Sequence, residues 1–131
     1  MNLLIDTNAY VGFKLANKEI VEYLARANSI LFSPIVLGEL MFGFRSGTQF
    51  HKNVEELNLF LANPAVEMIG IGEITSDRYS RIATQLKQNG TPIPSNDIWI
   101  AAQTMETGAE LVTMDHHFEK INNLVYRLFD R

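Results

Sequence analysis

The chain has 131 residues and no cysteine, with 47% hydrophobic residues, 20% charged residues and a formal net charge of −4 at pH 7. This length and composition predict a single globular domain over residues 1–131, and the lack of cysteine excludes disulfides, thiolate nucleophiles and cysteine-bound zinc. The negative charge argues against a protein that holds nucleic acid mainly through a broad basic surface, since such binding depends on Lys and Arg displacing counterions.

Short apolar runs alternate with longer segments of helical periodicity from the first residues onward. The predicted strands are 3–5, 30–32, 66–71 and 111–113, with a weaker candidate at 125–128. The opening residues contain no basic region, and no apolar run approaches the length needed to cross a bilayer. We therefore expect a cytoplasmic protein with no membrane partner.

Capping residues mark the ends of the helices predicted between these strands. The predicted helices are 18–27, 34–44, 48–62, 75–89 and 97–107. Asn17 and Ser33 are the expected N-caps of the first two, while Gly90 and Gly108 directly follow the last two, where a left-handed residue commonly ends a helix. Strands that alternate with helices in this way predict a three-layer α/β/α fold around a short, mainly parallel central sheet.

Three aspartates are expected at one edge of that sheet. Asp6 follows the first strand, Asp115 comes two residues after the strand at 111–113, and Asp97 opens the helix that leads into that strand. In an open parallel sheet the ligand crevice lies at the carboxyl ends of the strands, near the point where the strand order reverses. We therefore expect these three carboxylates to share one crevice.

Glu39 lies on a helix face that is otherwise apolar, with Ile35, Val36 and Phe42 as neighbours about one turn away. Burying an unpaired charge costs roughly several kcal/mol. The group is therefore neutral, or pairs with a cation, or belongs to a helix rotated toward solvent. We favour a functional cation, with a salt bridge or exposure as the alternative.

Each acid also has a purely structural interpretation. Asp6 could cap the turn that follows it, Asp97 could favour a helix N-terminus, and Asp115 could be an ordinary turn residue. Their conjunction indicates more, because four carboxylates gathered in one place would repel one another without a hard cation such as Mg²⁺ or Mn²⁺. The sequence therefore predicts a site for one or two divalent cations.

The acids lie in four short motifs that follow one another along the chain. These are Asp6-Thr7-Asn8, Val36-Leu37-Gly38-Glu39-Leu40, Ile93-Pro94-Ser95-Asn96-Asp97-Ile98-Trp99-Ile100-Ala101-Ala102 and Thr113-Met114-Asp115-His116-His117-Phe118. In order and in structural setting they resemble the motifs of a PIN domain of the VapC type, the toxin half of bacterial toxin–antitoxin pairs. The resemblance spans nearly the whole chain, and no acidic position departs from the pattern.

This resemblance implies a Mg²⁺- or Mn²⁺-dependent endoribonuclease that cleaves RNA, forms a homodimer and is held inactive by a cognate antitoxin protein. Asp6 and Asp97 would be the principal metal ligands, and Asp115 a further ligand, direct or through water. Glu39 would be a ligand or would orient the attacking water. The cation polarises the phosphate and lowers the pKa of a bound water, so that hydroxide attacks phosphorus in line.

A second group of side chains could hydrogen-bond these carboxylates and hold them in place. Its members are Thr7, Asn8, Asn96 and Thr113. Asn96 could serve equally well as the N-cap of the helix that follows it. The histidines His51, His116 and His117 are expected on the surface, because two adjacent residues do not both project easily toward one metal.

Three other functions compete with the nuclease. A receiver-like signalling domain wants its phosphoacceptor Asp at the end of the central third strand, whereas here that strand runs into Gly70-Ile71-Gly72-Glu73. A haloacid-type phosphatase wants a second Asp two residues after Asp6, where this chain has Asn8. A catalytically silent PIN-fold binding module is the remaining alternative, and the intact acidic set argues against it.

Overall fold

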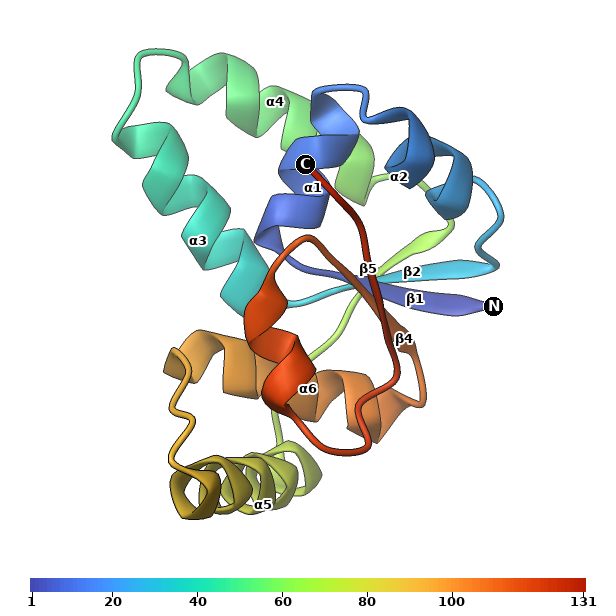
Figure 1. Cartoon of the computed structure of the whole chain (residues 1–131). Helices are drawn as coiled ribbons and strands as arrows, with labels where there is room; N and C mark the ends of the chain where they lie inside the picture. Colours follow the sequence, from blue (N-terminus) through green and yellow to red (C-terminus); the bar gives the residue numbers. More distant parts are fainter.

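The computed structural model describes every residue from Met1 to Arg131 and contains one five-stranded sheet between layers of helices (Figure 1). The strands are β1 (Asn2–Ile5), β2 (Ser29–Phe32), β3 (Val66–Met68), β4 (Glu110–Thr113) and β5 (Tyr126–Leu128). The helices are α1 (Thr7–Lys14), α2 (Lys18–Leu24), α3 (Pro34–Arg45), α4 (Phe50–Leu61), α5 (Glu73–Asn89) and α6 (Ser95–Thr107), with a 3-10 helix η1 (His116–Lys120). The strand order is β3-β2-β1-β4-β5, and every neighbouring pair is parallel.

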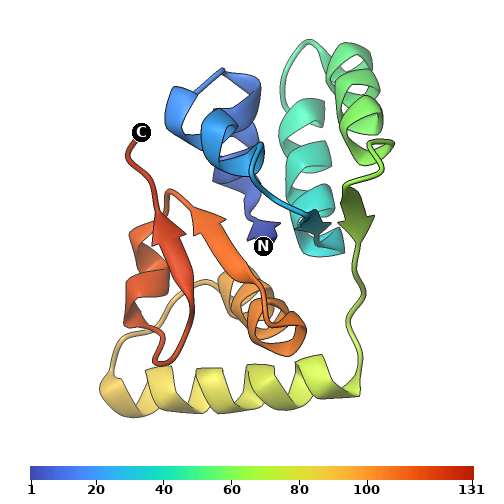
Figure 2. The same cartoon turned by 90° about the vertical axis from the view of Figure 1, so that its right-hand side faces the viewer.

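Helices cover both faces of the sheet, so the predicted three-layer α/β/α fold is confirmed. Helices α1 to α4 lie on one side of the sheet and α5 and α6 on the other, and Figure 2 shows α5 running along the base of the molecule below α6. None of these helices combines the length and the apolar character needed to cross a bilayer.

The centre of the core is β1, whose residues Leu3, Leu4 and Ile5 are fully buried. Side chains on both faces of a strand are buried only when the sheet is covered on both sides, which explains the unbroken apolar run. Tyr10 of α1 packs edge-to-face against Phe32 at the end of β2, with ring centroids 6.1 Å apart. This contact packs α1 against the carboxyl end of β2.

The first helix, α1, was not predicted, although it forms directly after β1. Thr7 and Asn8 are weak helix formers, and Gly12 near the end of this short helix lowers the propensity further. The helix forms because the carboxylate of Asp6 accepts the backbone N–H of Ala9 at 2.9 Å and so caps it. Tertiary burial of the α1 face adds the stability that local propensity lacks.

The third strand is shorter than predicted, because β3 ends at Met68 and not at residue 71. It lies at the edge of the sheet and pairs only with β2, whose last residue is Phe32. The carbonyl of Phe32 still accepts the N–H of Ile69, and beyond that point no strand residue remains for the segment to pair with.

Candidate metal centre

The acidic side chains gather where β1 and β4 end, at the point where the strand order reverses. From β1 the chain adds β2 and β3 on one side and then crosses to β4 and β5 on the other. The N–H of Asp6 donates to the carbonyl of Val112 at 3.3 Å, which extends the pairing of β1 with β4 by one residue. That extension brings Asp6 beside Thr113, at the carboxyl edge where open parallel sheets bind their ligands.

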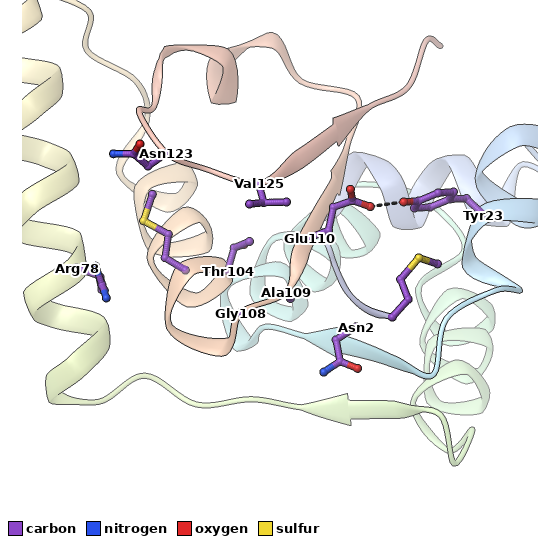
Figure 3. A pocket seen from close by; sticks show the side chains of 11 residues that line it. Asn2, Tyr23, Arg78, Thr104, Gly108, Ala109, Glu110, Asn123 and Val125 are labelled. Atoms are coloured by element: carbon purple, nitrogen blue, oxygen red, sulfur yellow. Dashed lines mark hydrogen bonds between the residues drawn. The ribbon is translucent and has the colours of Figure 1, made fainter.

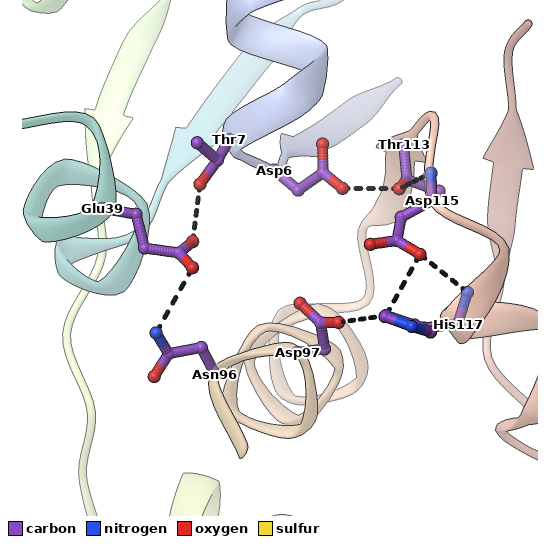
Figure 4. A network of polar contacts seen from close by, with 8 residues as sticks. All are labelled: Asp6, Thr7, Glu39, Asn96, Asp97, Thr113, Asp115 and His117. Atoms are coloured by element: carbon purple, nitrogen blue, oxygen red, sulfur yellow. Dashed lines mark hydrogen bonds and ion pairs between the residues drawn. The ribbon is translucent and has the colours of Figure 1, made fainter. Parts of the chain in front are cut away.

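Asp6 is the most deeply buried acid of the site, with 4% of its surface exposed. Its Oδ1 accepts the N–H of Ala9, and its Oδ2 accepts the hydroxyl of Thr113 (Figure 4). The pKa of Asp6 is raised to about 6, mainly by burial; the two hydrogen bonds lower it, and the charges of Asp97 and Asp115 add to the rise. The same carboxylate therefore caps α1 and carries a destabilised negative charge.

Asp97 is the third residue of α6 and reaches the site from the layer of helices opposite to α1. Burial raises the pKa of its carboxyl, and the nearby Asp115 and Glu39 raise it as well, while a hydrogen bond from His117 lowers it. Asp97 thus experiences the same crowding of negative charge as Asp6.

Thr113, the last residue of β4, links two of the acids. Its hydroxyl donates to Asp6 and accepts the N–H of Asp115 at 2.9 Å. Asp115 in turn caps η1, where its Oδ1 accepts the N–H of His117 at 2.9 Å. One short segment after β4 therefore fixes the positions of two carboxylates.

The histidines were expected on the surface, and the side chain of His117 is indeed 43% exposed, but its ring also contacts two of the acids. Its Nδ1 is 3.0 Å from Oδ2 of Asp97 and 3.2 Å from Oδ1 of Asp115. His116 points elsewhere, to Glu119 on the surface at 3.3 Å. The two adjacent side chains diverge because η1 begins directly after Asp115 and turns only the second histidine back toward the acids. The sequence signal for this contact was the spacing of two residues between the capping Asp115 and His117.

Glu39 faces the three aspartates across the site and is half-buried, rather than fully buried on an apolar stripe. Phe42, one turn further along α3, is 75% exposed, so this side of the helix borders solvent. The Thr7 hydroxyl donates to Oε1 of Glu39 at 2.6 Å, and the Asn96 amide donates to Oε2 at 3.3 Å. Hydrogen bonds from two other helices therefore hold the carboxylate in place.

Of the four side chains expected to hydrogen-bond the acids, three do so and one does not. Thr7, Asn96 and Thr113 each hydrogen-bond one of the acids, whereas Asn8 bonds none of them. Asn96 is the second residue of α6, and Pro94 occupies the N-cap position, so the alternative of Asn96 as N-cap was wrong. Pro94 suits the start of a helix because it has no N–H to leave unpaired.

The donor set fits a divalent cation. Asp97, Asp115 and His117 each offer one ligand atom, and these atoms all lie within 4.8 Å of one another. Asp6 lies beside them with a raised pKa, and a nearby cation would offset its charge without breaking either of its hydrogen bonds. Carboxylate oxygens with one imidazole nitrogen are ligands that a divalent metal accepts.

A second hollow of about 500 Å³ lies at the opposite, amino-terminal edge of the sheet (Figure 3). Its one carboxylate, Glu110, accepts a hydrogen bond from the Tyr23 hydroxyl and lies 3.9 Å from Arg127. A carboxylate with two such partners has no need of a cation. The chemistry of this fold is therefore expected at the acidic centre.

The sheet order and the acidic centre together define a parallel α/β domain with a carboxylate-rich site at its switch point. The family model of the PIN domain matches residues 3–124. The chain therefore belongs to the PIN domain family.

Among PIN domain proteins, the chain is similar to proteins named VapC. The chain is 33% identical to Ribonuclease VapC2 of Rickettsia felis over 85% of its own length and 82% of the relative's. It is 26% identical to Ribonuclease VapC1 of Haemophilus influenzae strain R2866 over 97% of each chain. Among solved structures, the fold is similar to that of VapBC2 of Rickettsia felis, which was crystallised bound to a DNA fragment from its promoter. The TM-score is 0.87 at 30% identity, and the match covers 99% of this chain and 100% of that chain.

Proposed function

We propose that this protein is a metal-dependent endoribonuclease and the toxin component of a type II toxin–antitoxin pair. The observation that carries the proposal is the convergence of Asp6, Glu39, Asp97 and Asp115 at the switch point of a PIN domain. The likeness to proteins named Ribonuclease VapC supports RNA as the substrate. A receiver-like domain or a silent binding module has no need for four carboxylates in one place.

The residues have separate roles in this proposal. Asp6 and Asp97 hold Mg²⁺ or Mn²⁺, with Asp115 as a further ligand, direct or through water. When bound, the cation polarises the scissile phosphate and activates water for attack on phosphorus. Asp6 is kept in position by Thr113 and the start of α1, so its carboxylate is preorganised before any ligand arrives.

Glu39 is a ligand or the group that orients the attacking water. Its two oxygens already accept hydrogen bonds from Thr7 and Asn96, which fixes the plane of the carboxylate. A fixed plane is what positioning a water molecule requires, because a misplacement of about 1 Å can cost roughly a hundredfold in rate.

The proposed protein partner is a cognate antitoxin that covers the acidic centre. A groove beside Glu39 is lined by Pro34, Ile35, Phe42 and Asn96 and combines an exposed aromatic ring with a carboxylate. An extended segment that places an apolar side chain against Phe42 and an Arg or Lys near Glu39 would complement both. A cytoplasmic homodimer completes the proposal and rests on the resemblance to VapC proteins.

The test is cleavage of RNA by purified protein with Mg²⁺ or Mn²⁺, with and without chelator. We expect cleavage with either metal and its loss in chelator and in Asp97→Asn. Asp77→Asn is the matched control, since Asp77 is a surface acid that pairs with Arg81 far from the centre. Cleavage that persists unchanged in chelator and in Asp97→Asn, after a mock purification has excluded a contaminating nuclease, would refute the proposal.

A further inference from the structure

The imidazole of His117 contacts the carboxylates of two of the acids. Its Nδ1 lies between Asp97, from α6, and Asp115, which follows β4. The ring is 43% exposed, so it borders the crevice and is not part of the core. The contact therefore joins α6 to the segment after β4 at the edge of the crevice.

Two of the distances in this triad match those between neighbouring ligands of one metal ion, and all three ligand atoms lie within 4.8 Å of one another. Ligand atoms at about 2.1 Å from an octahedral ion lie about 3.0 Å apart when they are adjacent. Nδ1 of His117 is 3.0 Å from Asp97 Oδ2 and 3.2 Å from Asp115 Oδ1. A cation could therefore bind all three atoms with only small side-chain movements.

The backbone holds His117 in this position independently of its ring. Its N–H donates to Oδ1 of Asp115 at 2.9 Å at the start of η1. This bond fixes the backbone of His117 beside Asp115, and from there the observed rotamer places the ring against both carboxylates. Such preorganisation is typical of a metal ligand.

We propose that Nδ1 of His117 is a direct ligand of the metal held by Asp97 and Asp115, and that this nitrogen makes the centre prefer Mn²⁺ over Mg²⁺. The inference rests on the proposed metal-dependent function. Mg²⁺ takes oxygen ligands in a strict octahedron and gives up its waters reluctantly, whereas transition metals accept imidazole nitrogen. The competing explanation is that the ring only donates a hydrogen bond to the carboxylates, in which case a metal would displace it.

Pulsed electron paramagnetic resonance of the Mn²⁺-loaded protein tests the ligand directly, because a bound ¹⁴N nucleus modulates the electron spin echo. We expect nitrogen modulation in the wild type and in His116→Ala, and its loss in His117→Ala and His117→Gln. His116 is a matched control because it is adjacent, exposed and paired only with Glu119. Wild-type protein that binds Mn²⁺ without nitrogen modulation would overturn the proposal, whatever the variants do.

Calorimetric titration with each metal supplies a second measurement. Loss of His117 should weaken Mn²⁺ binding by roughly tenfold or more while changing Mg²⁺ binding much less, so that the preference for Mn²⁺ shrinks. An equal loss for both metals would contradict a nitrogen ligand that favours Mn²⁺, and tighter binding of both metals would favour a ring that the metal displaces.

The proposed function and the ligand role of His117 can be refuted separately. If wild-type protein cleaves RNA and binds Mn²⁺ at a site that Asp97→Asn destroys, yet shows no nitrogen modulation, the inference about His117 fails and the proposed function stands. If the wild type binds neither metal and cleaves nothing, the proposed function fails, and the inference fails with it.

Discussion

Replacing Asp6 by Asn should stabilise the metal-free protein at neutral pH while it destroys the metal centre. The folded-state pKa of Asp6 is about 6 and its ordinary value is 3.8, mainly because the carboxyl is buried. Below pH 4 the group is protonated in both the folded and the unfolded state and costs nothing. As the pH rises from 4 to 6, the unfolded chain releases its proton first, so the folded state loses stability through that window.

The magnitude follows from the size of the shift. About two pKa units at roughly 1.4 kcal/mol each set an upper limit near 3 kcal/mol on the cost of the charged Asp6 at pH 7. Asn still accepts the N–H of Ala9 as an N-cap, but the Thr113 hydroxyl loses its charged acceptor, which offsets about 1 to 2 kcal/mol. A net gain of about 1 to 2 kcal/mol should remain.

Urea unfolding in chelator at several pH values between 4 and 8 measures this effect. The variant should be less stable than or equal to the wild type at pH 4 and more stable at pH 7, with the difference changing sign in between. Added Mn²⁺ should stabilise the wild type by mass action and leave the variant nearly unchanged. A variant that is less stable by the same amount at every pH would refute the reasoning, because it would show that the carboxylate is only a cap.

Three further predictions concern neighbouring residues. Without metal, Asp97→Asn should melt at or above the wild-type temperature; its melting temperature should rise less on addition of Mg²⁺, and RNA cleavage should be lost. A lower melting temperature together with a full Mg²⁺ response would indicate that Asp97 only stabilises the helix N-terminus. Thr7→Val should reduce the single-turnover cleavage rate by roughly tenfold because Glu39 loses its hydrogen bond, whereas Thr7→Ser keeps the hydroxyl and most of the rate. Equal rates for both variants would show that Thr7 does not position Glu39. Phe42→Ser should weaken antitoxin binding in a calorimetric titration without changing cleavage, and Leu59→Ser, at an equally exposed position, should change neither. Identical effects of the two variants would show that the antitoxin does not bind in the groove beside Glu39.

Most helices and strands could be predicted from the sequence because their ends depend on local chemistry. Asn17 and Ser33 cap the helices that were predicted to follow them, and Gly90 and Gly108 adopt the left-handed conformation at the ends of α5 and α6. These features involve residues close in sequence, so they can be predicted from one amino-acid sequence alone. Helix α1 escaped prediction because its stability comes from burial and from the Asp6 cap, which periodicity does not register.

The candidate site was partly readable for the same reason. Asp6, Asp97 and Asp115 could be placed at one sheet edge, since the end of a parallel strand fixes the edge at which the next residue emerges. The sequence left exposure of Glu39 open as an alternative and could not decide it, because the half-buried position depends on how α3 packs against the rest of the molecule. Its apolar neighbours suggested a buried face, and tertiary packing left that side of the helix open.

The sequence by itself determined the fold class, the ends of β1 and β4 and the identity of the acids, since each depends on residue type and short-range spacing. Only the tertiary structure decided which side chains meet across the centre: the Thr7 and Asn96 bonds to Glu39, and the contact of His117 with Asp97. Those contacts join residues 20 to 57 positions apart. Their existence depends on the angle and depth at which helices pack on the sheet, and spacing along the chain does not encode either quantity.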